Sequence, residues 1–165
     1  MKAKCVFITS LIVCVLLFSS CEDNTNDLLT DLAPGTMIYI INDQEPAYFN
    51  DCNWTNYGQD LKGQIAIKGS DETGRNNIYI YIGEDGNQNK LSVRSYSTAF
   101  ANDKTIVFTS FGSSDVDANV TVDITKITDT EISGRFNGKV SMGNSQPVRI
   151  RGAFRALTHI AAIHP

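Results

Sequence analysis

The fold is decided by the stretch EISGRFNGKVS, residues 131–141, together with PVRIRGAFRA, residues 147–156, which follows it after a short loop. In both stretches every second residue is apolar or glycine, an alternation typical of a β-strand with one buried face. The residues predicted to face inward are Ile132, Gly134, Phe136, Gly138 and Val140 in the first strand and Val148, Ile150, Gly152 and Phe154 in the second. The intervening MGNSQ suits a hairpin loop. Glycines on a buried face indicate close approach of another backbone or a tight bend.

Shorter stretches with a period of two precede this hairpin. They are residues 36–41, 47–52, 64–68, 77–82, 90–96, 104–111 and 118–127, and in 77–82 three isoleucines share one face while Tyr79 and Tyr81 share the other. After residue 20 no helical period lasts beyond about two turns, and residues 94–103 are the best candidate for a short helix or an irregular crossing. We therefore expect one all-β domain over residues 35–165. It is predicted to be an antiparallel β-barrel of the calycin or lipocalin type, or a β-sandwich, of about eight strands.

The N-terminus has the features of a targeting signal and not of a part of the folded domain. Lys2 and Lys4 precede a run from Cys5 to Phe18 of 14 residues that only Thr9 and Ser10 interrupt. A membrane-spanning helix needs about 20 residues, so the run has the length of a signal-peptide core. Residues 1–20 are predicted to be a signal peptide, and the alternative is a buried helix.

The end of this run, LFSSC at residues 17–21, resembles the lipobox of bacterial lipoproteins. The resemblance implies that Cys21 is acylated and becomes the new N-terminus, with residues 21–34 as a flexible tether. Phe18 departs from the commoner Leu, Val or Ile. The alternative is ordinary secretion with Cys21 as a free thiol.

Two further features resemble the lipoproteins of Bacteroidota. Acids directly after the cysteine, in EDNTND at residues 22–27, resemble their surface-export signals, although a plain solvated linker has the same composition. The C-terminal hairpin, with ISGRF at 132–136 and GAF at 152–154, resembles that of small uncharacterised surface lipoproteins in the same group. This implies a location on the outer membrane, lipid-anchored and facing the cell surface, with the periplasmic leaflet as the alternative. It implies no activity.

Cysteine usage and charge narrow the functional classes. Cys5 and Cys14 would leave with the signal, so Cys52 would be the only thiol in the mature chain, predicted to be a small buried residue. The whole chain has 14 basic and 18 acidic residues, a balance that disfavours nucleic-acid binding. The charge is lopsided, with −9 over residues 22–85 and +3 over residues 86–165. Either the opposite charges of the two halves neutralise each other within the fold, or the surface has one negative and one positive region.

Aromatic and amide residues gather in YFNDCNWTNY, residues 48–57. Sugar binding needs apolar faces for stacking and planar polar groups for hydroxyls, and this segment holds both. The candidate ligand-binding residues are Tyr48, Asn53, Trp54 and Tyr57. The alternative is that the aromatic residues are core and the asparagines form turns.

A second candidate is a cluster of cations on the last hairpin. Arg149, Arg151 and Arg155 share one face of the final strand, and Arg135 and Lys139 lie on the same face of its partner. Such a face suits an anionic glycan or lipid headgroup. The alternative is a solvated face whose charges pair with acids on neighbouring strands.

Catalysis and cofactors find little support in the sequence. Asp115, Asp117 and Asn119 have the spacing of a calcium loop, but Val120 and Lys126 occupy the places where an EF-hand needs glycine and glutamate. His159 and His164 lie in the last seven residues, and the sequence holds no G-x-S-x-G, no H-E-x-x-H and no Gly-rich phosphate loop. We expect no cofactor, no metal and no enzymatic activity. The expected function is a non-catalytic binding module for glycans or small amphipathic ligands, and the alternative is a protein-interaction subunit or inhibitor.

Overall fold

The computed structural model describes residue 28 and residues 31–57, 64–83, 90–98, 106–110, 116–142 and 146–158, with the backbone alone for 106–110, 116–118 and 142. Every element in these residues is a strand, which confirms the all-β expectation. The strands are β1 (Thr36–Ile41), β2 (Ala47–Phe49), β3 (Asp51–Asn56), β4 (Ile65–Ser70), β5 (Asn77–Ile82), β6 (Ser95–Ser97), β7 (Ile106–Ser110), β8 (Val116–Ile127), β9 (Glu131–Met142) and β10 (Val148–Thr158). In the described part of the chain, no helix is long and apolar enough to cross a membrane. The signal peptide, Cys21, Asp115 and both histidines lie outside the described residues.

All ten strands belong to one sheet, ordered β6-β8-β9-β10-β3-β4-β5-β7, with β1 on β10 and β2 on β1. The expectation of a purely antiparallel sheet is wrong at one place, because β10 and β3 pair in parallel through Leu157↔Asn53 and Thr158↔Trp54. The cause lies in the chain path. Strand β1 is antiparallel to β10, β2 turns back along β1, and β3 continues in the direction of β2. Strand β3 thereby runs in the same direction as β10 and pairs with the edge of β10 just beyond the point where β1 begins, because Thr36 pairs with Arg155 and β3 pairs with Leu157 and Thr158.

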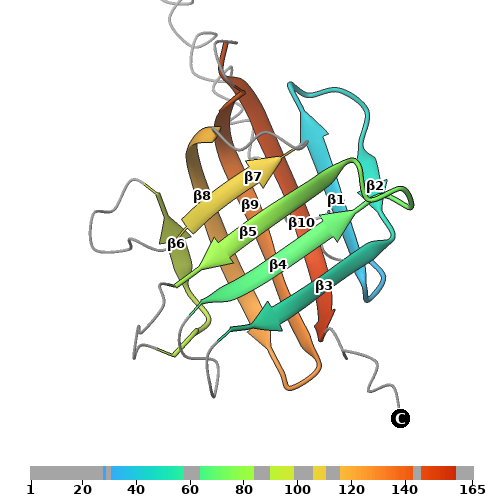
Figure 1. Cartoon of the computed structure of the whole chain (residues 1–165), viewed down its shortest axis with the longest axis vertical. Coiled ribbons are helices and arrows are strands. Elements are labelled where there is room, and N and C mark those ends of the chain that lie inside the picture. Colours follow the sequence, from blue (N-terminus) through green and yellow to red (C-terminus); the bar gives the residue numbers. More distant parts are fainter. Residues whose placement is uncertain are drawn as a thin grey trace, which may run out of the picture.

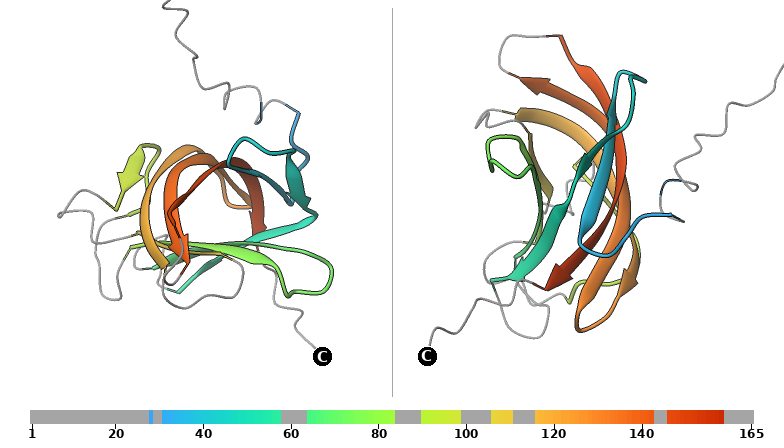
Figure 2. Two further views of the ribbon diagram at one scale, coloured as in Figure 1. Left: turned by 90° about the horizontal axis from the view of Figure 1, so that it is seen from above. Right: turned by 90° about the vertical axis from the view of Figure 1, so that its right-hand side faces the viewer.

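The sheet is strongly curled and forms a half-barrel (Figure 1; Figure 2). Strands β3, β4 and β5 lie across β8, β9 and β10, and the main hydrophobic core fills the space between these layers. The largest fully buried side chains include Phe49, Phe136 and Phe154. The outer surfaces of the two layers therefore face in opposite directions, and each is a separate candidate for binding.

The β9–β10 hairpin confirms the predicted inward faces, and Phe136 is 1% exposed. The register explains the inward glycines, since Phe136 lies opposite Gly152 and Phe154 lies opposite Gly134. A Cβ on Gly134 would meet the Phe154 ring at 2.6 Å, and one on Gly152 would overlap the Phe136 ring. Each phenylalanine thus fills the space that the opposing glycine leaves open.

Three stretches differ from the sequence prediction. The predicted strand 47–52 is two strands, β2 and β3, separated at Asn50. Of the predicted strand 90–96 only residues 95 and 96 belong to a strand, β6, and before it Leu91 is buried while Val93 is 60% exposed. The described part of the candidate helix, residues 94–98, holds β6 and not a helix.

Candidate functional site

The four ligand-binding candidates of residues 48–57 do not form one site. Trp54 points into the core and is 6% exposed, which confirms the alternative interpretation for this residue. Tyr48, on β2, is 59% exposed and lines a pocket on the outer side of β1. Asn53 and Tyr57 lie on the outer side of β3, where Asn53 Nδ2 donates to Asp51 Oδ1 at 3.0 Å. Alternation along a strand separates Trp54 from its neighbours.

The structure places Asn53 and Tyr57 on the same outer surface as two tyrosines of β5. Strand β4 lies between β3 and β5, and its register places Asn53 across from Lys68, which is in turn across from Tyr79. Thr55 lies across from Ala66, which is across from Tyr81. We call the outward residues Asn53, Tyr57, Lys68, Tyr79 and Tyr81 the tyrosine face.

Two rings of the tyrosine face are held parallel. The Tyr79 and Tyr81 ring centroids are 5.8 Å apart with an interplanar angle of 7°. Lys68 Nζ lies 5.6 Å from the centroid of the Tyr79 ring, within the range of a cation–π contact. Ala66 lies between Thr55 and Tyr81 and is 6% exposed. Its short side chain leaves a shallow depression beside the Tyr81 ring. The result is an aromatic surface edged by an amide and an ammonium.

The neighbours of Tyr81 on this face affect its phenol group. Burial, followed by the nearby Tyr57 and Tyr79, raises the pKa of Tyr81. Its hydroxyl therefore stays protonated at neutral pH and can both donate and accept a hydrogen bond. Tyr57 itself is 60% exposed. The tyrosine face can thus offer aromatic rings and neutral hydroxyl groups to the same ligand.

The cations of the last hairpin do share the outer side of β8, β9 and β10, which we call the cationic face: Lys126, Arg135, Lys139, Arg149, Arg151 and Arg155. Some of them pair with acids, as the alternative interpretation predicts. Arg151 Nη2 lies 3.3 Å from Asp43 Oδ1, and Arg149 Nη1 lies 4.0 Å from Asp43 Oδ2. Arg135 and Lys139 form no ion pair with any residue that the structure describes.

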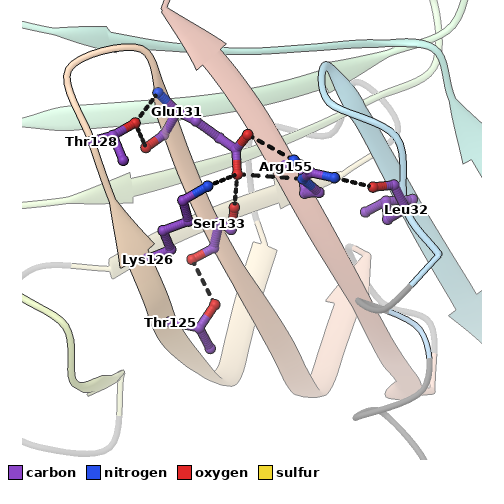
Figure 3. A network of polar contacts seen from close by, with 7 residues as sticks. All are labelled: Leu32, Thr125, Lys126, Thr128, Glu131, Ser133 and Arg155. Atoms are coloured by element: carbon purple, nitrogen blue, oxygen red, sulfur yellow. Dashed lines mark hydrogen bonds and ion pairs between the residues drawn. The ribbon is translucent and has the colours of Figure 1, made fainter.

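Arg155 belongs instead to a polar network around Glu131, shown in Figure 3. Arg155 donates through Nη2 to Glu131 Oε2 at 2.9 Å and through Nε to Oε1 at 3.3 Å. Ser133 Oγ donates to Oε1 at 2.6 Å, and Lys126 Nζ lies 3.2 Å from the same oxygen. We call these four residues the Glu131 clasp. They tie β8, β9 and β10 together on the outer side of the sheet.

The Glu131 carboxylate is 9% exposed and would be costly to bury without these donors. The hydrogen bonds from Arg155, then that from Ser133, lower the pKa of Glu131 to about 2. A carboxylate so far below neutral pH is permanently ionised under ordinary conditions and is unsuited to general acid or base catalysis. The clasp is therefore a structural network built around the Glu131–Arg155 ion pair.

The clasp also holds the segment before β1. Arg155 Nη1 donates to the carbonyl oxygen of Leu32 at 2.8 Å, and Gly35 N donates to the carbonyl oxygen of Arg155 at 2.7 Å. Leu32, Ile38 and Ala153 form a second small core on the outer side of the sheet, with Leu28 packed against it. We call residues 31–35 the strap. Its Leu32 is 5% exposed, although the sequence places it in a flexible tether.

A small pocket lies beside the strap. Its volume is about 150 Å³, and it is lined by Leu28, Asp31, Leu32, Ile38 and Tyr48. Most sites for drug-sized ligands are at least about twice as large. The pocket accommodates a small group at most, so the open tyrosine face is the better candidate for a ligand.

The described residues supply no other reactive centre. Cys52 is a free, buried thiol, as predicted, and burial followed by the Asp51 carboxylate raises its pKa. A protonated, buried thiol is a poor nucleophile. Within the described ranges, no group of three or more His, Cys, Asp or Glu side chains is placed to hold a metal ion.

Sequence reasoning missed two features that involve long-range pairing. It placed Tyr79 and Tyr81 on one face but had no means of placing β5 near β3. It also missed the Glu131 clasp, although a signal existed. Centring the hairpin on residue 144 aligns Ser133 with Arg155, which brings Glu131 diagonally next to this arginine.

Comparison with known proteins adds no further assignment to this geometry, since no family model, no curated protein and no solved structure matches the chain.

Proposed function

We propose that this chain is a surface lipoprotein, anchored by acyl chains on Cys21 to the outer membrane, and that it binds glycans through the tyrosine face without catalysing a reaction. The observation that carries the ligand class is the parallel Tyr79–Tyr81 pair with Lys68 beside it. Aromatic rings stack on the apolar faces of sugar rings, while amide, ammonium and phenol groups hydrogen-bond to sugar hydroxyls. The LFSSC motif supports the anchor.

We further propose that the curled sheet is a small, incompletely closed barrel and not a sandwich. Support comes from the strand order, which runs from β6 to β7 through a single sheet without a break. A sandwich would divide the strands between two sheets. The barrel interior is filled by core side chains, so the ligand is assigned to the outer surface and not to a barrel mouth.

The glycan proposal is tested by screening the mature chain, residues 21–165, on a glycan array and titrating an oligosaccharide that binds by calorimetry. We expect Tyr81→Ala to weaken binding by about two- to tenfold, because one stacked ring contributes about 0.5–1.5 kcal/mol. The control is Tyr48→Ala, which removes a tyrosine that is 59% exposed and lies outside the tyrosine face, and it should leave affinity unchanged.

Two results would contradict the proposal. One is that no glycan binds the parent chain, and the other is that Tyr48→Ala weakens binding as much as Tyr81→Ala. A chain that binds no sugar but co-purifies with one fixed protein would instead indicate an interaction subunit or inhibitor.

A further inference from the structure

We propose that the cationic face is the side of the domain that lies against the membrane, where it contacts the anionic phosphate groups of lipids. The inference rests on the proposed anchor at Cys21. It concerns a different surface from the tyrosine face and a different partner, so the two proposals can fail separately.

The first argument is where the chain leaves the domain. The strap and Leu28 pack on the outer side of β1 and β10, and Figure 2 shows this segment outside the curl of the sheet. Ala153, which Leu28 and Leu32 help to cover, lies directly across from Arg135 of the cationic face. The chain toward Cys21 therefore departs beside this face and not from the tyrosine face.

The second argument is the length of the connection. Six residues lie between Cys21 and Leu28, and even when fully extended the seven residue-to-residue steps span only about 25 Å. The Arg155–Leu32 hydrogen bond and the small outer core fix the end of this connection on the sheet. An acylated Cys21 would keep the cationic face close to the lipid headgroups.

The third argument is charge. The cationic face carries six cations, the acids next to them are Asp43, Asp123 and Glu131, and the strap on the same side adds Asp31, which leaves a net charge of +2 among these described side chains. Asp123 lies across from Arg135 and accepts a hydrogen bond from Ser95. By contrast, the outer sides of β3, β4 and β5 carry one acid and one cation, Asp51 and Lys68.

Two cations are especially suited to a lipid phosphate. Lys139 is exposed, and neither it nor Arg135 is paired with an acid of the described chain. With this face against the membrane, the opposite layer would direct the tyrosine face toward the solution, where glycans are accessible.

The experiment measures binding of the mature chain carrying Cys21→Ser to vesicles by flotation. This chain keeps every described residue and has no acyl group, so binding depends on the protein surface alone. The vesicles contain either phosphatidylcholine or equal parts of phosphatidylcholine and phosphatidylglycerol. We expect preferential binding to the anionic vesicles that weakens with salt, because each basic residue near such a surface contributes about fivefold to partitioning.

The double variant Arg135→Gln/Lys139→Gln should lower the partition coefficient more than tenfold. The matched control, Arg75→Gln/Lys90→Gln, removes two exposed cations from outside the cationic face and should have little effect. Equal binding to both kinds of vesicle, or an equal loss in the two variants, would overturn the proposal. Salt dependence of the parent provides a test that does not depend on the folding of a variant, and binding that is indifferent to salt would also overturn it.

Discussion

Among single residues, Glu131 makes the clearest energetic contribution that is open to measurement. Its pKa falls from 4.5 to about 2 on folding because Arg155 and Ser133 donate to the carboxylate. The lowered pKa means that the stabilisation is complete above about pH 4.5 and is lost as pH falls toward 2. The difference of about 2.5 units corresponds to about 3 kcal/mol of unfolding free energy.

We therefore predict that the chain loses about 3 kcal/mol between pH 5 and pH 2 from this group alone. Urea unfolding of the parent and of Glu131→Gln at several pH values measures the contribution, because the other carboxylates titrate in both proteins. Glu131→Gln should be less stable at pH 7, and the difference should shrink toward pH 2. A constant difference across this range would show that the clasp does not titrate as described.

At the level of single strands, the sequence predicted those elements whose alternation is dictated by one buried face. The bounds of β1 and β5 agree with the predicted 36–41 and 77–82, and the inward residues of β9 and β10 are confirmed. Prediction failed for the pairing of strands, because the alternation of apolar and polar residues within a strand does not show which strand lies beside it. The parallel contact of β3 with β10 depends on the path through β2, and the tyrosine face depends on the order of β3, β4 and β5.

The same limit applies to the individual site residues. Trp54 alternates with Asn53, so at most one of them can be on the outer side of β3. Which of the two faces outward depends on which side of β3 is buried. The structure shows that the side with Cys52 and Trp54 packs in the core. Sequence composition grouped four residues of one segment, whereas the structure places Trp54 in the core, Tyr48 beside β1, and Asn53 and Tyr57 on the outer side of the sheet.

The strap is an element whose stability can be separated from that of the sheet. Leu32→Ala removes a side chain that is 5% exposed and that packs in the small outer core. Phe136→Ala, the matched change in the main core, should lower the free energy of global unfolding by about 3–5 kcal/mol. We predict that Leu32→Ala mainly loosens the strap, so that its limited proteolysis accelerates while the melting temperature falls much less than in Phe136→Ala.

Equal losses of melting temperature in the two variants would show instead that the strap and the sheet unfold as one unit. Unchanged proteolysis of the strap in Leu32→Ala would show that the outer core does not hold it.

For the whole molecule, the number of reactive thiols tests the fold and the proposed anchor together. Cys52 is 2% exposed and its pKa is raised by burial, so a thiol reagent should not reach it until the sheet unfolds. The chain has three other cysteines, Cys5, Cys14 and Cys21. If the signal is cleaved and Cys21 is acylated, protein extracted from membranes should show no reactive thiol when native and one per chain in denaturant.

Two thiols in denaturant would indicate cleavage without acylation, and four would indicate an uncleaved, unmodified chain. One fast-reacting thiol in the native acylated protein would place Cys52 outside the core, which would contradict the packing of β3 against the rest of the half-barrel.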